Sequence, residues 1–177
     1  MELKTLPLRR ILGPAAIIIA AVTLGACTTT GDVTTIGATD CKRISKKAQA
    51  KINWARVPSI DVRVRNDEFE PMILRLRQGR PYILRIRNRD DGPHTFRAAR
   101  FLQQNAIMTV AINGKRLEEN CVRSVSIPGR QTAEIRMVAV VDGHYEFEDN
   151  VLLFPWVFSS GPSGIIIVEE RVQTAGG

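Results

Sequence analysis

The stretch NDEFEPMILRLRQGRPYILRIRNRDDGPHTF, residues Asn66–Phe96, decides how the rest of the chain is interpreted. Apolar and basic residues alternate over Met72–Arg77 and again over Tyr82–Asn88, with Gly79 in the turn between the two runs. Alternation with a period of two residues predicts half-buried β-strands. The stretch closes on His94, one of only two histidines in the chain, so it is the first residue to consider for metal or proton chemistry.

Short strands continue through most of the chain beyond this stretch. From Ser59 onward, alternating or apolar runs are separated by turn signals such as Asn113-Gly114, Pro128-Gly129 and Asp142-Gly143. Before them, apolar residues spaced by three and four over Cys41–Ala55 predict a short amphipathic helix with basic residues elsewhere on its surface. Many short strands and one helix predict an all-β sandwich or barrel.

The N-terminus has the pattern of a secretion signal. Arg9 and Arg10 precede the apolar run Ile11–Thr23, which is too short to span a bilayer comfortably. The following Leu24-Gly25-Ala26-Cys27 resembles a bacterial lipobox, which is cut before a cysteine that is then acylated. Because Thr28 stands where an inner-membrane retention Asp would be, we expect an outer-membrane lipoprotein facing the periplasm.

The chain divides into five parts on these patterns. We expect a lipoprotein signal peptide over 1–26, a flexible tether over 27–40, a short basic helix and linker over 41–58, a β-sandwich over 59–170 and a C-terminal tail over 171–177. The sandwich and helix together are long enough to bury one core.

The three cysteines are consistent with a location in the periplasm. Lipidation uses Cys27, which leaves Cys41 and Cys121 in an oxidising compartment, where a disulfide is expected. It would close a loop of about 80 residues, for which chain entropy gives an upper figure of about 4.5 kcal/mol of stabilisation.

Composition and motifs indicate which kinds of partner and activity to expect. The side chains carry a net charge of +7, and +5 once the leader is removed, which favours an acidic protein or anionic lipid heads as partner. Nucleic acid is not expected, because the interleaved aromatic and basic residues of single-strand binders are missing. The sequence has no nucleophile elbow, Gly-rich phosphate loop or HExxH motif, so we expect no enzyme.

Several short motifs, in order, resemble the cupredoxin family over about Ser59 to Glu170. They are Asn66-x-x-Phe69-x-Pro71, Tyr82-x-Leu84, Asn88-x-Asp90, His94-x-Phe96, Gly143-x-Tyr145-x-Phe147 and Gly161-x-x-Gly164. The resemblance implies an eight-stranded Greek-key β-sandwich, often with a type 1 copper site held by His, Cys, His and a weak axial Met.

The ligands of that site are mostly missing. By the resemblance, His94 stands at the first ligand position, whereas Asp149 stands where the cysteine would follow Phe147. No Cys, His or Met occurs between Asp149 and Gly164. A blue copper site needs the thiolate, so the departure argues against electron transfer through type 1 copper.

Two other metal sites remain as hypotheses. His94 and Asp149 would approach each other if Asp149 faces inward with Tyr145 and Phe147, and they could begin a Cu(II) or Zn(II) site. Alternatively, His144 with Glu146 and Glu148 could bind a metal on the opposite face. The structural alternative for His94 is a buried histidine hydrogen-bonded to Asp149 or to a backbone carbonyl.

Two features are candidate partner-binding surfaces. The uncharged segment VLLFPWVF, Val151–Phe158, replaces the metal loop, and its Phe154, Trp156 and Phe158 either form a docking patch or fill the space that the metal site vacates. Arginines alternate along the strands and form either a basic platform for an acidic partner or a solvated face. The arginines are Arg63, Arg65, Arg75, Arg77, Arg85, Arg87 and Arg89.

Together these patterns predict a lipid-anchored periplasmic binding or assembly module without type 1 copper and without a required cofactor. Its partners would be the membrane, through the lipid, and a protein that the sequence does not identify. One alternative is a copper-binding or copper-delivery protein that uses His94 with carboxylate or Met ligands. Another is an auxiliary subunit of a membrane-associated redox complex.

Overall fold

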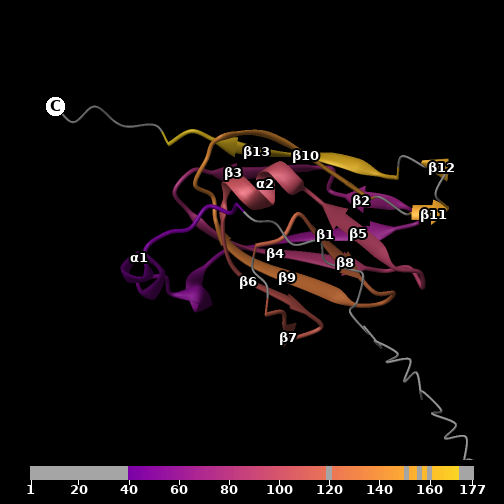
Figure 1. The fold of residues 1–177 in the computed structure, drawn as a ribbon, viewed down its shortest axis with the longest axis horizontal. Coiled ribbons are helices and arrows are strands. Elements are labelled where there is room, and N and C mark those ends of the chain that lie inside the picture. The colour runs from indigo at the N-terminus through magenta and orange to yellow at the C-terminus, as the bar shows by residue number, and fades with distance from the viewer. Residues whose placement is uncertain (1–39, 119–120, 150–151, 155–156, 159–160, 172–177) are drawn as a thin grey trace, which may run out of the picture. The chain divides into compact units, whose positions relative to one another are not determined.

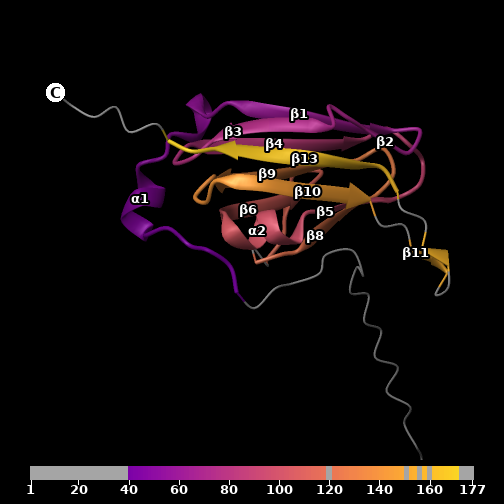
Figure 2. The same cartoon turned by 90° about the horizontal axis from the view of Figure 1, so that it is seen from above.

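A computed structural model describes residues 40–118, 121–149, 152–154, 157–158 and 161–171, with the backbone alone for 152–154 and 157–158. The predicted signal peptide, most of the tether, Cys27 and most of the C-terminal tail lie outside these residues. The described strands form two sheets that face each other across a common core (Figures 1 and 2). Among the described residues, no helix is both long and apolar enough to cross a membrane.

The larger sheet has six strands in the order β2-β1-β4-β9-β6-β7. The second and third strands in this order, β1 and β4, run in parallel, and the other neighbouring pairs are antiparallel. The strands are β1 (Ser59–Arg65), β2 (Glu68–Glu70), β4 (Pro81–Asn88), β6 (Ala106–Ile112), β7 (Lys115–Arg116) and β9 (Thr132–Val138).

The second sheet has five strands in the order β3-β13-β10-β5-β8, and only β3 and β13 are parallel. These strands are β3 (Ile73–Arg77), β5 (His94–Arg97), β8 (Ser124–Ile127), β10 (Gly143–Asp149) and β13 (Ser163–Glu169). A separate two-stranded hairpin joins β11 (Leu152–Phe154) to β12 (Val157–Phe158), between β10 and β13 in the chain.

The alternation in the sequence produces the core. Val62, Val64, Leu74, Leu76 and Ile86 are buried, while the arginines between them face outward. Near the end of the sandwich that holds His94, three aromatic rings pack together, with centroids 5.1 to 6.2 Å apart. These rings are Phe69, Phe96 and Phe147. The predicted all-β sandwich is confirmed.

The turn at Gly79 does not form a hairpin, although the sequence places a strand on each side of it. β3 pairs with β13, whereas β4 lies between β1 and β9 in the other sheet. The backbone N–H of Gln78 donates to Glu169 at the end of β13, and that of Gly79 donates to Ala139 just after β9. The turn therefore crosses from one sheet to the other, because its donors find partners in both.

The helices differ from the expected one. α1 spans only Lys46–Ala50, and a separate 3-10 turn, η1 (Trp54–Arg56), follows because the Asn53 side chain accepts a hydrogen bond from Ala55 and starts a new turn. A second helix, α2 (Ala99–Gln104), lies between two predicted strands and has no sequence signal that we identified. It buries Phe101 and Leu102, neighbours in the sequence.

The predicted disulfide between Cys41 and Cys121 is confirmed. Their Cα atoms lie 5.6 Å apart, and the bond closes a loop across 80 positions. It links the segment before α1 to the chain just before β8, and the neighbouring Lys42 N–H donates to Gln103 at the end of α2. The helical N-terminal segment is therefore attached covalently to the sandwich.

Gly164 tests the packing of the core at the start of β13. A Cβ atom there would overlap the Phe147 ring and the Met72 carbonyl oxygen, whereas one at Gly92 would meet nothing within 4 Å. We expect Gly164→Ala to lower the free energy of unfolding in urea by about 1–3 kcal/mol, as overpacking usually does. Gly92→Ala is the matched control, and equal stability of the two variants would contradict this packing.

Candidate functional site

One end of the sandwich brings together side chains from both sheets. His94 begins β5 and Asp149 ends β10, and these strands pair so that Asp149 lies opposite Phe96. Asp90 comes from the loop after β4, in the larger sheet. Asp149 faces inward with Tyr145 and Phe147, as strand parity predicts.

The imidazole of His94 lies between two carboxylates. Its Nδ1 atom pairs with Oδ2 of Asp149, and its Nε2 atom lies 3.0 Å from Oδ2 of Asp90. The His94 side chain is 5% exposed and that of Asp149 is fully buried. The backbone N–H of Thr95 donates to the second Asp149 oxygen at 2.7 Å. We call this arrangement, Asp149–His94–Asp90, the carboxylate clamp.

Asp90 is held by the turn between β1 and β2. The backbone N–H groups of Asn66 and Asp67 donate to its two oxygens, at 3.0 and 3.5 Å. Both turn residues have left-handed backbone conformations, φ 52° and 58°, which Asn and Asp tolerate better than most residues. The Asn-Asp sequence thus lets the turn direct two donors at Asp90.

The loop that carries Asp90 depends on the buried amide of Asn88. Its Nδ2 group donates to the carbonyl oxygens of Gly92, Ile127 and Pro128 at 2.8 to 3.2 Å, and its Oδ1 atom accepts from the Asp90 N–H. A buried amide with these partners fixes the loop against the end of β8. Asn88 therefore positions Asp90 relative to His94.

The clamp needs more protons than a neutral imidazole supplies. Neutral imidazole has one N–H, but both His94 nitrogens face carboxylate oxygens, so a second proton or another cation must lie between Nε2 and Asp90. Burial lowers the pKa of His94, but Asp149 and then Asp90 outweigh it and leave that pKa above its usual value. The pKa of Asp90 lies below its usual value, chiefly because the backbone N–H of Asn66 donates to it. Desolvation opposes this shift, and the hydrogen bond to His94 adds to it.

The sequence identifies part of this site. It predicts that His94 and Asp149 meet, but it leaves the roles of Asp90 and Asn88 unassigned, although the Asn88-x-Asp90 motif is visible. His144 is exposed on the opposite face of β10 with Glu146 and Glu148, and its metal role stays a prediction. Trp156 lies outside the described residues, as do the side chains of Phe154 and Phe158.

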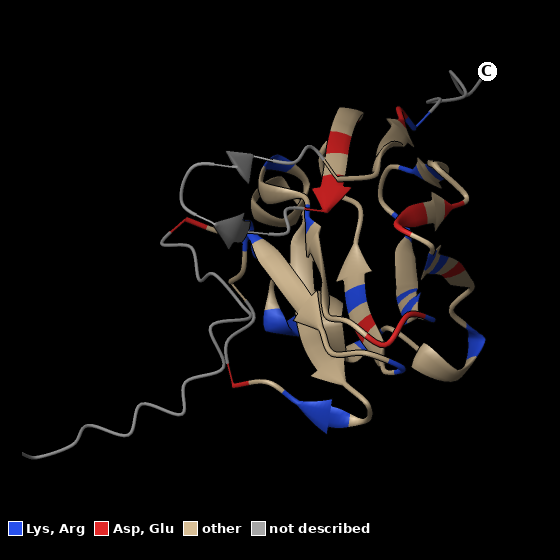
Figure 3. Cartoon of the chain, turned by 90° about the vertical axis from the view of Figure 1, so that its right-hand side faces the viewer, with Lys and Arg blue, Asp and Glu red and all other residues tan. Residues whose placement is uncertain are grey.

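The arginines do not form a single platform. Arg75 and Arg77 lie on β3 of the second sheet, whereas Arg85 and Arg87 lie on β4 of the larger sheet. Acidic and basic positions are mixed on neighbouring strands (Figure 3). Four ion pairs join them: Arg63–Glu70, Arg75–Glu169, Arg85–Glu134 and Arg87–Asp61, at 2.7, 3.4, 3.3 and 2.8 Å. Acids therefore pair with four of the seven arginines named in the sequence.

The residues at the clamp do not fit type 1 copper. The carboxylate of Asp149 pairs with Nδ1 of His94, at the position that the cupredoxin resemblance assigns to a thiolate. Both cysteines in the described part of the chain, Cys41 and Cys121, are joined in a disulfide and offer no thiolate. Without a copper–thiolate bond, the donor set lacks the group that gives a blue site its electronic character.

Comparison with solved structures finds cupredoxins and multicopper oxidases at low similarity. Auracyanin A, a blue copper protein from Chloroflexus aurantiacus, is 14% identical, with 63% of this chain and 99% of that chain covered and a TM-score of 0.41. A laccase from Pediococcus acidilactici is 12% identical, with 74% and 29% covered and a TM-score of 0.49. The multicopper oxidase mgLAC is 14% identical, with 63% and 44% covered and a TM-score of 0.44.

The chain thus spans less than half of these two oxidases. No protein-family model and no curated protein sequence matches it. The similarity to cupredoxins agrees with the resemblance in the sequence, but at these identities and TM-scores it carries no further conclusion about this chain.

The two pKa shifts of the clamp predict how stability depends on pH. His94 stabilises the fold fully below its unfolded pKa of about 6.5, and this contribution is lost as the pH rises through the higher folded pKa. The slope in that window is about 1.4 kcal/mol per pH unit. Asp90 acts oppositely: its contribution is present above about pH 3.8 and is lost on acidification.

Denaturant unfolding of the full chain from about pH 2 to pH 9 would measure both effects. Replacing His94 by Ala should remove the loss above about pH 6.5, whereas the exposed His144→Ala control should retain it. An unchanged slope in the His94 variant would contradict the role of the clamp.

Proposed function

We propose that the chain is a lipid-anchored, periplasm-facing binding module that uses a cupredoxin-like sandwich as a scaffold rather than as an electron carrier. The observation that carries this proposal is the pairing of Nδ1 of His94 with Asp149, at the position where the resemblance places the copper-binding thiolate. An internal ion pair at that position gives the end of the sandwich a structural role.

The hairpin β11–β12 supports a docking role. It replaces the metal loop of the family, and among the described strands β11 and β12 pair only with each other. The segment Val151–Phe158 carries no charge and includes two Phe and one Trp. Isolated two-stranded hairpins are marginally stable in water, and aromatic residues dominate the energetics of protein interfaces. A protein partner that covers this hairpin would bury its apolar residues.

The proposed periplasmic location is inferred from the sequence and is consistent with the disulfide. The lipobox at Leu24–Cys27 supplies the anchor, and residues before the folded part supply a tether. The Cys41–Cys121 bond is of the kind that persists in an oxidising compartment such as the periplasm. The lack of familiar catalytic motifs favours a binding protein over an enzyme.

Cross-linking of a tagged full chain in its native membranes would test the docking role. We expect a specific partner whose association weakens by about thirtyfold or more in Phe154→Ser and Phe158→Ser, since truncating an interface hot spot costs about 2 kcal/mol or more. The control variant is Met72→Ser with Ile73→Ser, which alters two exposed apolar side chains elsewhere. Equal capture by both variants, or no specific partner, would overturn the proposal.

A further inference from the structure

A second group of ligand atoms lies on the side of the His94 ring that faces away from Asp149. One donor atom each from Asp67, Asp90 and His94 lies within 4.8 Å of the other two. His94 is buried, Asp90 is partly exposed and Asp67 is exposed. The group therefore reaches from the interior of the clamp to the protein surface.

Asp149 prepares the imidazole to bind a cation at Nε2. Histidines that bind a metal through one nitrogen usually donate the other N–H to a carboxylate, which fixes the tautomer and the ring orientation. Asp149 is fully buried and faces Nδ1 in this way. The Nε2 lone pair then faces Oδ2 of Asp90 at 3.0 Å, and two acceptors at that distance require a positive charge between them.

We propose that Nε2 of His94, Asp90 and Asp67 form a binding site for a divalent ion of the zinc class. Imidazole nitrogen and carboxylate oxygen are common zinc ligands, with water completing the tetrahedron. Two carboxylates and a neutral imidazole carry two negative charges, which Zn²⁺ neutralises, whereas a single proton in the place of the ion leaves one. In the absence of the ion, a proton occupies the position between Nε2 and Asp90.

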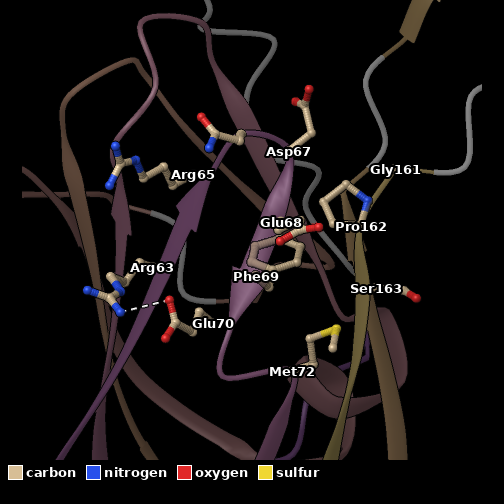
Figure 4. Close-up of a pocket in the computed structure, with 11 residues that line it drawn as sticks. Arg63, Arg65, Asp67, Glu68, Phe69, Glu70, Met72, Gly161, Pro162 and Ser163 are labelled. Atoms are coloured by element: carbon tan, nitrogen blue, oxygen red, sulfur yellow. Dashed lines mark hydrogen bonds and ion pairs between the residues drawn. The ribbon is translucent and has the colours of Figure 1, made fainter.

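The site is open to solvent at Asp67, which is exposed, and at Asp90, which is partly exposed. Asp67 lines one end of a surface groove of about 730 Å³ between the β1–β2 turn and the start of β13, next to residues such as Glu68 and Pro162 (Figure 4). The spacing of up to 4.8 Å exceeds what zinc bonds of about 2.1 Å permit, so a ligand side chain must rotate. Asp67 can do so because it is exposed.

This site is separate from the other sites considered for the chain. The Asp149 carboxylate faces Nδ1, whereas the proposed ion binds Nε2, so the site uses neither a thiolate nor the hypothetical His94–Asp149 ligand pair. It also does not depend on docking through β11–β12. A chain that binds zinc here without any protein partner would leave this inference intact.

Calorimetric titration of the chelator-stripped full chain with ZnCl₂ tests the site directly. We expect one ion per chain, and an affinity at least tenfold weaker in Asp67→Asn. Asn preserves the left-handed backbone at this position, and the hydrogen bond to Asp90 comes from the backbone, so the variant should fold. His144→Gln is the control for adventitious binding to the other histidine and should bind as the wild type does.

Two buffers of different ionisation enthalpy add a second readout. Because the ion displaces the Nε2 proton, binding near pH 6 should release about one proton per ion and should tighten as the pH rises. The inference is overturned if no stoichiometric ion binds, if Asp67→Asn binds as tightly as the wild type, or if His144→Gln removes the binding. Binding without proton release would also overturn the assignment to Nε2.

Discussion

The carboxylate clamp joins the two sheets at one end of the sandwich. His94 and Asp149 belong to β5 and β10 of one sheet, while Asp90 follows β4 of the other and is held by the turn between β1 and β2. Burying charges costs several kcal/mol of solvation free energy for each ion, so the clamp is stable only because each buried group has a charged or hydrogen-bonding partner. Removing one member leaves an uncompensated charge, which typically costs 3–5 kcal/mol.

The ion pairs on the outer faces contribute less to stability than the clamp does. Those of Arg63, Arg75, Arg85 and Arg87 are substantially exposed, and such pairs contribute about 0–1 kcal/mol each. Their importance lies in preventing repulsion, because Arg63 and Arg87 are register partners on β1 and β4. Glu70 and Asp61 neutralise these two arginines from β2 and β1. These pairs therefore reduce the repulsion between neighbouring arginines, while the net charge of the chain, which already counts these acids, stays at +7.

Patterns of local origin could be predicted from the sequence. Strand alternation gives the inward and outward faces, Asn113-Gly114 gives the β6–β7 hairpin, and the cysteine count gives the Cys41–Cys121 bond. Features that depend on distant partners could not. The crossing at Gly79 depends on acceptors at Ala139 and Glu169, which lie 60 and 90 positions away in the chain.

The site shows the same division. Parity along β10 places Asp149 inside, but no local pattern indicates that Asp90 turns back to the His94 ring or that Asn88 holds it there. The sequence does not predict α2 for a related reason. Asn105 follows the helix, and its Nδ2 group donates to the carbonyl oxygen of Phe101. Its Oδ1 atom accepts from the backbone N–H groups of Val140 and Val141, which lie far along the chain. In both cases, a polar side chain in a loop is satisfied by groups that the sequence does not place nearby.

We infer that His94 is an internal cation between two carboxylates and not a copper ligand through Nδ1. Nitrogen-15 NMR of the imidazole in the metal-free full chain, with His144→Gln used for assignment, tests it most directly. Because Asp149 and Asp90 raise the pKa of His94, we expect both ring nitrogens to be protonated below pH 6.5 and one proton to be lost only above it. A neutral His94 ring well below pH 6.5, or an Nδ1 signal abolished by stoichiometric Cu(II) binding, would contradict it.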